Sequence, residues 1–126
     1  RGDASNRVDE LAERLEIDLS RPIRTYSHGM KQKVALLQAF QHDPDLLVLD
    51  EPSQGLAPVL AQDVFNTIGK LKDEMGLTIL LVEQNAEASI DAADYVYIMH
   101  EGTIMADGKP HEIRRSPEVR EAYLGV

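Results

Sequence analysis

The sequence contains no cysteine, which excludes disulfide bonds and thiolate metal sites within its 126 residues and is compatible with a cytosolic protein. No apolar run is long enough to span a bilayer, and no signal-peptide pattern opens the chain. Basic residues are scarce, since 13 lysines and arginines stand against 22 aspartates and glutamates, for a net charge of −9. Because neither half of the chain is basic, we expect no nucleic acid among its partners.

The remaining composition is that of a globular domain. Hydrophobic residues make up 43% of the sequence and charged residues 28%, as in soluble proteins. The length has room for one ordinary core, and we find neither an internal repeat nor a low-complexity linker. We therefore expect residues 1–126 to form a single domain.

Hydrophobic periodicity predicts the order of helices and strands. Apolar residues at helical spacing predict six helices, over residues 7–15, 28–41, 58–75, 85–91, 111–115 and 117–124. The third is expected to begin at Pro58 and to end at Gly76. The first shares one face among Val8, Leu11, Ala12 and Leu15, and the second among Met30, Val34, Leu37 and Gln41. Short apolar runs predict four strands, over residues 46–49, 78–82, 95–99 and 103–106.

The strands fall into two kinds. The first two are apolar throughout, which is typical of strands buried on both faces of a parallel sheet. The last two flank His100, Glu101 and Gly102, which predicts a β-hairpin with glycine in its turn. The sequence therefore indicates an α/β fold, with parallel strands flanked by helices and a C-terminal hairpin as an antiparallel edge.

Two adjacent carboxylates, Asp50 and Glu51, follow the first strand and precede Pro52. Ligands of open α/β sheets bind at the carboxyl ends of strands, and charge that is buried there needs a cation or a proton-transfer task to offset its cost. Asp50 is suited to hold Mg²⁺ through a coordinated water, and Glu51, on the other side of the strand, to orient an attacking water. Alternatively, the pair merely ends a strand in a solvated loop.

A polar loop opens the second helix upstream of these carboxylates. It offers the Ser27 hydroxyl, the flexible Gly29 and the N-terminus of a helix, whose backbone N–H groups and dipole attract anions. Alternatively, Ser27 is an ordinary N-cap followed by a glycine in the first turn.

Together these two segments resemble the signature loop and the Walker B strand of an ATP-binding cassette (ABC) ATPase. The common form of the signature loop is Leu-Ser-Gly-Gly-Gln. Ser27 and Gly29 match it, whereas Tyr26, His28 and Met30 depart from it. In the family this loop contacts the phosphates of ATP, so the resemblance implies that Ser27, Gly29 and Met30 do the same.

The resemblance also implies roles further along the chain. Asp50 would bind ATP through Mg²⁺, and Glu51 would be catalytic. Residues 53–58 resemble the loop that crosses to a second cassette in a dimer, with Ala57 where aspartate is common. Gln84 stands where a histidine of the switch loop usually contacts the γ-phosphate. The resemblance implies a catalytic role for it, although glutamine can donate a hydrogen bond but cannot become a cation.

Two parts of the chain resemble different branches of the family. The residues from Glu51 onward, including Glu83-Gln84-Asn85 and the end at 122–125, are similar to branched-chain amino acid importer ATPases. Residues up to Leu49 look like exporter-type cassettes. A natural mosaic would explain the difference, as would an engineered chimera joined near the Walker B strand. The four histidines have no metal-ligand spacing and are expected at the surface or at helix caps.

Several parts of a complete cassette have no counterpart in this sequence. It holds no Gly-x-x-x-x-Gly-Lys-Ser/Thr, the P-loop that supplies most of the phosphate grip, and no Q-loop glutamine or adenine-stacking aromatic before the signature loop. The resemblance thus implies the C-terminal half of a nucleotide-binding domain, catalytically silent alone. The alternative is a non-catalytic or engineered α/β assembly module derived from the cassette fold. A receiver-like acidic pocket is disfavoured because Lys109 lies in a predicted turn.

The resemblance implies cofactors and partners for the parent protein. ATP and Mg²⁺ would bind the complete cassette, with none bound to this chain alone. The expected partners are a P-loop-containing half or a second cassette, a transmembrane permease subunit, and further copies of the chain. The parent protein would be cytoplasmic and peripheral to the inner face of the cell membrane.

Overall fold

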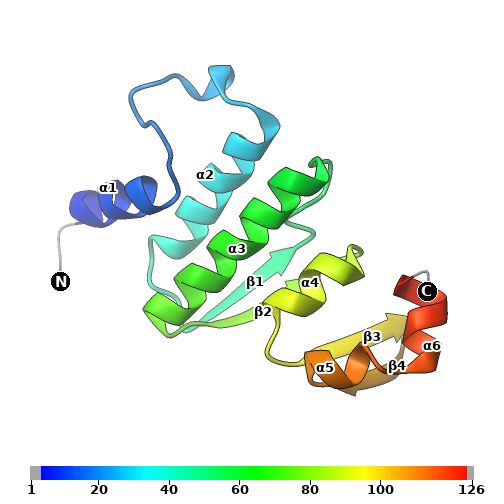
Figure 1. The fold of residues 1–126 in the computed structure, drawn as a ribbon. Helices are drawn as coiled ribbons and strands as arrows, with labels where there is room; N and C mark the ends of the chain where they lie inside the picture. The colour runs from blue at the N-terminus through cyan, green and yellow to red at the C-terminus, as the bar shows by residue number, and fades with distance from the viewer. Residues whose placement is uncertain (1–3, 125–126) are drawn as a thin grey trace. The chain divides into compact units, whose positions relative to one another are not determined.

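The computed structural model describes residues 4–124, and these form two compact units (Figure 1). The first unit runs up to Glu83 and the second begins at Gln84. Within the described residues, no helix is both long enough and apolar enough to cross a membrane.

Four helical segments and two strands make up the first unit. In chain order they are α1 (Ala4–Arg14), the 3-10 turn η1 (Ile23–Thr25), α2 (His28–Phe40), β1 (Leu46–Asp50), α3 (Pro58–Met75) and β2 (Thr78–Val82). Pro58 occupies the first turn of α3, where its missing N–H is not needed. Gly76 ends that helix in the left-handed conformation, with a φ of +65°. Both helix-end predictions are confirmed.

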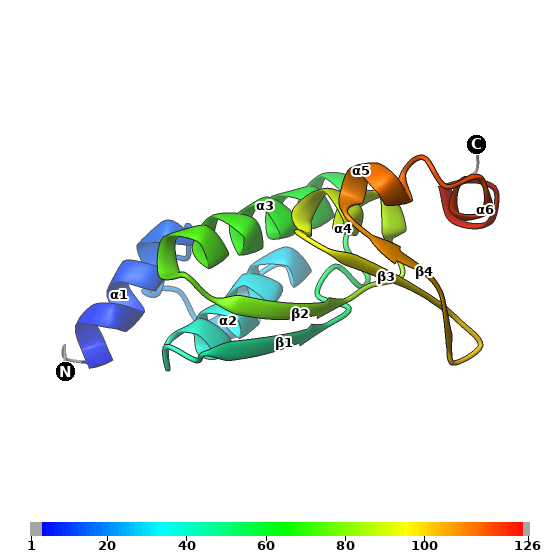
Figure 2. The same cartoon turned by 90° about the horizontal axis from the view of Figure 1, so that it is seen from below.

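β1 and β2 pair in parallel, from Leu46 opposite Thr78 to Asp50 opposite Val82. α3 makes the crossover between them, and α2 and α3 lie on the same side of the two strands (Figures 1 and 2). Leu47 and Leu49 point to this side and join the core. This arrangement brings the carboxyl ends of both strands to one edge, where Asp50 lies.

The prediction that both strands are buried on both faces is wrong. Along β1 buried and exposed residues alternate, and Leu46, Val48, Leu80 and Val82 keep between 47% and 57% of their surface exposed. The reason is that both long helices of this unit cover one face only. The opposite face is an aliphatic strip, made of these four side chains.

The core of the first unit combines α1, α2, α3 and the inner face of β1. Of the predicted face, Leu11 and Ala12 of α1 and the following Leu15 are buried, and Val8 is partly buried. In α2 the most buried side chain is Phe40, at 0% exposure, on a face that the predicted Met30–Val34–Leu37 series only partly covers. Further core residues come from the middle of α3 and from the segment between α1 and α2, and include Ile17, Tyr26, Val64, Ile68 and Leu71.

The second unit contains α4 (Ala86–Ala92), β3 (Val96–His100), β4 (Thr103–Gly108), α5 (Pro110–Ile113), α6 (Pro117–Val119) and a π-helical turn (Arg120–Leu124). The hairpin prediction is confirmed, because β3 and β4 pair antiparallel around Glu101 and Gly102. Both turn residues have positive φ, 47° and 77°, as the favoured two-residue hairpin turns require.

The hairpin is a separate sheet and not an edge of the parallel pair. Within residues 4–124 the strands form two two-stranded sheets, which corrects the prediction of one sheet with an antiparallel edge. The second unit has its own core of Ile90, Ile98, Ile113 and Val119, so β3 and β4 pack locally onto the short helices that surround them.

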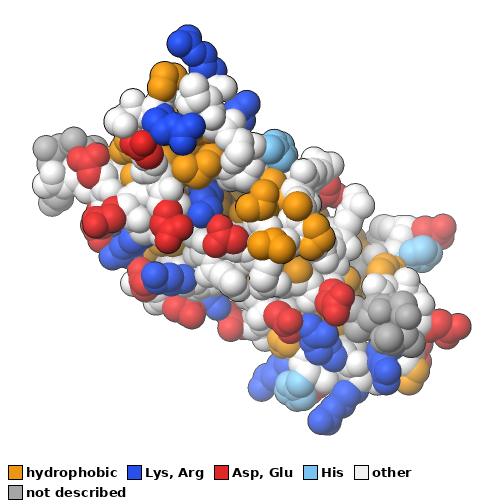
Figure 3. All heavy atoms as spheres, turned by 45° about the horizontal axis from the view of Figure 1, so that its top comes forward, with side chains coloured by type: hydrophobic (Ala, Val, Ile, Leu, Met, Phe, Trp, Pro, Cys, Tyr) orange, Lys and Arg blue, Asp and Glu red, His pale blue; other side chains and the backbone are white. Residues whose placement is uncertain are grey.

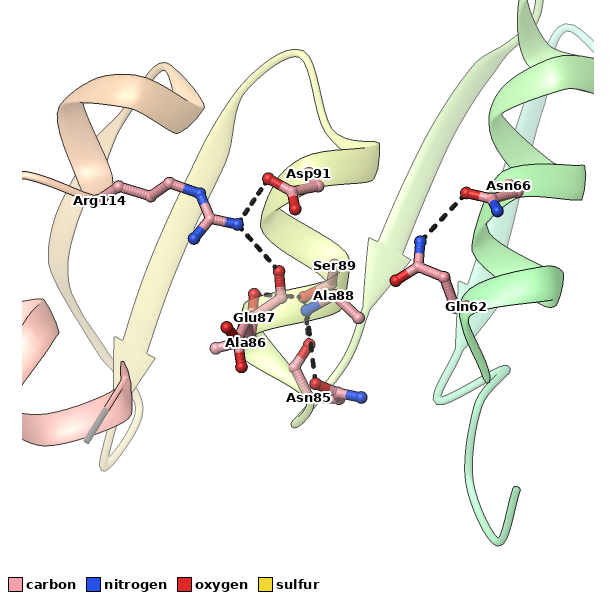
Figure 4. Close-up of polar contacts among 9 residues, drawn as sticks. All are labelled: Gln62, Asn66, Asn85, Ala86, Glu87, Ala88, Ser89, Asp91 and Arg114. Atoms are coloured by element: carbon pink, nitrogen blue, oxygen red, sulfur yellow. Dashed lines mark hydrogen bonds and ion pairs between the residues drawn. The ribbon is translucent and has the colours of Figure 1, made fainter. Parts of the chain in front are cut away.

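Polar side chains fix both ends of α4 (Figure 4). Asn85 caps its start by accepting the Ala88 N–H at 3.4 Å. The Arg114 guanidinium donates to the carbonyl of Glu87, in the first turn of α4, and to the carboxylate of Asp91, near its end. The segment after α5 is thereby tied to α4 within the second unit. The same view shows Gln62 donating to Asn66, one turn along α3.

Candidate functional site

Asp50 and Glu51 lie at the carboxyl end of β1, where the sequence places them. Asp50 is exposed, and its carboxylate makes no hydrogen bond or ion pair with the described residues. Glu51 is half-buried, and its backbone takes a φ of +45°, which is uncommon for a residue with a side chain. Its N–H donates to the Val82 carbonyl at 2.8 Å. The peptide between the two acids is therefore held against the end of β2.

A third carboxylate, Glu83, forms a hydrogen bond with the loop that follows Asp50 and Glu51. It comes directly after β2, and its Oε1 accepts the backbone N–H of Ser53 at 2.8 Å. Ser53 is only 8% exposed, so this carboxylate satisfies an amide that water barely reaches. The prediction missed this role. The available signal was an acid directly after an apolar strand, in the position that Asp50 holds on the neighbouring strand.

Residues 53–57 form a compact turn, here called the 53–57 loop. The Gln54 N–H donates to the Glu51 carbonyl at 3.0 Å, and the Leu56 N–H donates to the Ser53 carbonyl at 3.1 Å. Gly55 has a φ of +73°, which glycine adopts without strain. The loop thus folds back on itself before α3 begins.

Ser27 caps α2, as the local alternative predicted. Its Oγ accepts the Met30 N–H at 3.2 Å, while its own backbone is extended. The hydroxyl lies at the exposed, positive end of a 13-residue helix. Gly29 is buried in the first turn of α2, where a Cβ would lie 3.5 Å from a methyl carbon of Leu60 in α3.

His28 connects the start of α2 to the 53–57 loop. Its Nε2 lies 3.1 Å from the Gln54 carbonyl oxygen. The structure therefore brings together the two polar segments that the sequence singled out. His28 is exposed, as predicted for the histidines. In the described part of the chain, no group of three or more histidines and carboxylates is arranged to hold a metal ion.

Gln84 belongs to the second unit and precedes the Asn85 cap of α4. It is exposed at the start of that unit. The predicted site residues are thus divided. Five of them, Ser27, Gly29, Met30, Asp50 and Glu51, lie in the first unit.

Family models match both ends of the chain. The model described as "ABC transporter" matches residues 3–54, which include the Ser27 loop and Asp50–Glu51. The model described as "Branched-chain amino acid ATP-binding cassette transporter" matches residues 103–126. Among curated proteins, the high-affinity branched-chain amino acid transport ATP-binding protein BraG of Pseudomonas aeruginosa is 40% identical over 120 residues. The alignment covers 95% of this chain and 51% of BraG.

Solved structures agree with the sequence comparisons. The ADP conformation of MJ1267, an ATP-binding cassette of an ABC transporter, matches all of this chain and 52% of its own, with 29% identity and a TM-score of 0.82. The chain is part of an ABC transporter ATP-binding cassette. The cbiO1 protein from Clostridium perfringens, part of the ABC transporter complex cbiONQ, also has 29% identity and a TM-score of 0.82.

These matches confirm the predicted fold class, because the neighbours are ABC cassettes with the P-loop NTPase fold. This cassette segment spans about half the length of the curated relatives that it matches. The alignment with BraG covers 95% of the chain, so it includes residues on both sides of Asp50 and Glu51.

Proposed function

We propose that residues 1–126 are the C-terminal half of a nucleotide-binding domain that hydrolyses ATP to drive the uptake of branched-chain amino acids. The observation that carries the proposal is the position of Asp50 and Glu51 at the carboxyl end of β1, held against β2 by the Glu51–Val82 hydrogen bond. The solute class comes from the name of BraG, which matches 95% of the chain.

The carboxylates at the strand end fit a site for Mg²⁺ and water. Asp50 presents an exposed carboxylate without a partner among the described residues, and oxygen ligands of this kind are those that Mg²⁺ prefers. Mg²⁺ would neutralise charge on the phosphates of bound ATP. In this proposal Asp50 holds the ion, and Glu51 orients the attacking water and accepts its proton.

The start of α2 fits an anion. The Ser27 hydroxyl and the first amides of the helix lie at its positive end, which attracts anions. We assign the phosphate contacts to Ser27, Gly29 and Met30. Gln84 would donate a hydrogen bond to a phosphate oxygen, in place of the histidine that is common in the family.

The aliphatic strip on β1 and β2 supports a partner that completes the domain. Strands of a parallel sheet are normally covered on both faces, and here one face is exposed. A P-loop-containing half, or a second cassette, would supply the phosphate grip that this sequence does not contain. In the parent protein we expect a transmembrane permease as a further partner, at the inner face of the cell membrane. A natural mosaic or an engineered chimera of exporter-type and importer-type segments is our hypothesis for the origin of the sequence.

The proposal is tested by supplying the missing half. The chain is mixed with the P-loop-containing half of BraG, and steady-state MgATP hydrolysis is measured. We expect turnover from the mixture and none from either half. Glu51→Gln should abolish turnover while ATP still binds, because the proton acceptor is lost at constant size. The exposed Glu121→Gln is the matched control and should keep full activity.

Two results would contradict the proposal. One is submicromolar ATP affinity of the isolated chain in calorimetry, which would show a complete nucleotide site within these residues. The other is unchanged single-turnover hydrolysis in the Glu51→Gln mixture, which would show that Glu51 is not the base.

A further inference from the structure

The contact between His28 and Gln54 joins two segments that lie 26 residues apart in the sequence. His28 is the first residue of α2 and directly follows Ser27. Gln54 lies three residues after Glu51, in the 53–57 loop. A single side chain therefore connects the helix start next to Ser27 with the loop that follows Glu51.

The surroundings of the ring show that the two segments meet closely. A Cβ at Gly55 would lie 3.2 Å from His28 Nε2, which is tighter than most real Cβ contacts. A Cβ at Gly29 would lie 3.5 Å from Leu60, in the first turn of α3, which is an ordinary van der Waals contact. Glycines thus stand at both places where α2 approaches the segment after β1. Apolar side chains gather on the face drawn in Figure 3. Val59 and Leu60, in the first turn of α3, are exposed.

The 53–57 loop is held from two sides. Glu83 accepts the Ser53 N–H at its start, and His28 reaches the Gln54 carbonyl one residue later. The first contact ties the loop to the end of β2, and the second ties it to the start of α2. The hydrogen bonds of the Gln54 and Leu56 amides within the loop complete this arrangement.

We propose that His28 is a positioning residue that fixes the 53–57 loop to the start of α2, and so sets Ser27 relative to Asp50 and Glu51. The functional consequence rests on the proposed ATPase role, whereas the contact itself does not. His28 contacts neither a phosphate nor the attacking water in this proposal. It acts through the loop.

The chemistry of the bond is specific. A carbonyl oxygen only accepts, so Nε2 must carry the proton and donate it. The neutral Nε2–H form and the imidazolium both satisfy this requirement. An alanine at position 28 cannot donate, whereas the amide of a glutamine can.

Two measurements on the full 126-residue chain test the proposal without nucleotide. Long-range ¹H–¹⁵N spectra at alkaline pH report the tautomer of each histidine, and we expect His28 as the Nε2–H form. Amide hydrogen exchange then reports the loop. His28→Ala should speed exchange of the Gln54 and Leu56 amides by about fivefold, the effect of losing one ordinary hydrogen bond.

The control variants separate this role from general destabilisation. His28→Gln should restore slow exchange at both amides, because it keeps a donor. His42→Ala removes an exposed histidine elsewhere and should leave both rates unchanged. An Nδ1–H tautomer for His28, or equal exchange in His28→Ala and the unmodified chain, would overturn the proposal. If the mixture with the P-loop half fails to hydrolyse ATP but these rates change as expected, only the proposed function fails.

Discussion

The two strand pairs of this chain are built in opposite ways. β1 and β2 are parallel and are joined through the 18-residue helix α3, whereas β3 and β4 are antiparallel and are joined by Glu101 and Gly102. Both pairs bury one face and expose apolar side chains on the other. The exposed face of the first pair is aliphatic, while that of the hairpin includes Tyr97, whose hydroxyl suits a wet surface.

This difference indicates which face needs a partner. Antiparallel hairpins commonly leave one face in water, but parallel strands occur almost only with both faces covered. The hairpin is closed by local contacts, since its turn and its helices adjoin it in sequence. The parallel pair depends on segments distant in sequence and still lacks cover on one side. We therefore propose that the P-loop-containing half, if it is the partner, docks on the aliphatic strip.

The largest expected effect is a loss of stability in the core of the first unit, with a smaller effect on the core of the second. Phe40→Ala removes a fully buried ring from the first unit and should lower its free energy of unfolding by about 3–5 kcal/mol. Because Phe40 belongs to a core cluster that Ile98 does not share, amides of β3 and β4 should lose less protection than those of α2 and α3. Hydrogen exchange resolved by residue measures both.

The matched control for this core variant is Val59→Ala, at a side chain that is 80% exposed. It should change the free energy of unfolding by no more than about 0.5 kcal/mol. Equal loss of protection throughout the chain of the Phe40→Ala variant would show that the two cores unfold as one, and would remove the basis of the comparison.

The second effect concerns self-association through the aliphatic strip. Without the other half, we expect the chain to pair through this face, because Val48 and Leu80 lie opposite each other on it and are exposed. Leu80→Lys would place an unpaired charge in that contact and should weaken association by about a hundredfold. Light scattering across a micromolar concentration series measures the change.

The hairpin supplies the control for this second effect. Met99→Lys places the same charge on the exposed face of the other strand pair and should leave association within about threefold of the original. A chain that stays monomeric without any substitution would contradict the expectation. It would favour the alternative of a self-contained module.

Elements with local signals were predictable from the sequence, and faces set by distant contacts were not. Pro58 and Gly76 mark the ends of α3 through their own backbone chemistry, and the structure confirms both. The series of apolar residues in α2 predicted a helix but not its core face. Phe40 is the most buried residue because it lies in the core that α2 shares with α1, α3 and β1, and that core is assembled from segments distant in sequence.

The candidate site divides in the same way. Asp50 and Glu51 were recognisable because an apolar run led directly into them. The partners of Glu83 and His28 lie 30 and 26 residues away, so no spacing in the sequence reveals those contacts. The exposure of one face of β1 and β2 could not be predicted either, because an apolar run does not indicate how many helices are present to cover the strand.

A smaller effect compares glycines of the two units at matched positions. Gly76 ends α3 with a φ of +65°, and Gly102 closes the hairpin with a φ of +77°. A Cβ would meet nothing within 4 Å at either site, so an alanine costs only backbone strain. We expect Gly76→Ala and Gly102→Ala each to lower stability by about 1 kcal/mol in urea unfolding. A much larger loss at one site would show that this end contributes contacts of its own.

The smallest effect is a pH dependence confined to the hairpin. The Tyr95 hydroxyl donates to Asp107 Oδ2 at 2.5 Å, and this hydrogen bond raises the pKa of Tyr95 to about 12. Because the folded pKa lies above the ordinary tyrosine value of 10.0, the contribution of this pair is present in full below pH 10. It is then lost as the pH rises towards 12.

Ultraviolet titration of the tyrosines should show one late-titrating group. Tyr95→Phe should remove it, and Asp107→Asn should return its pKa towards the ordinary value. If the late group persists in the Tyr95→Phe variant, it belongs to another tyrosine, and the hydrogen bond between Tyr95 and Asp107 is not its cause.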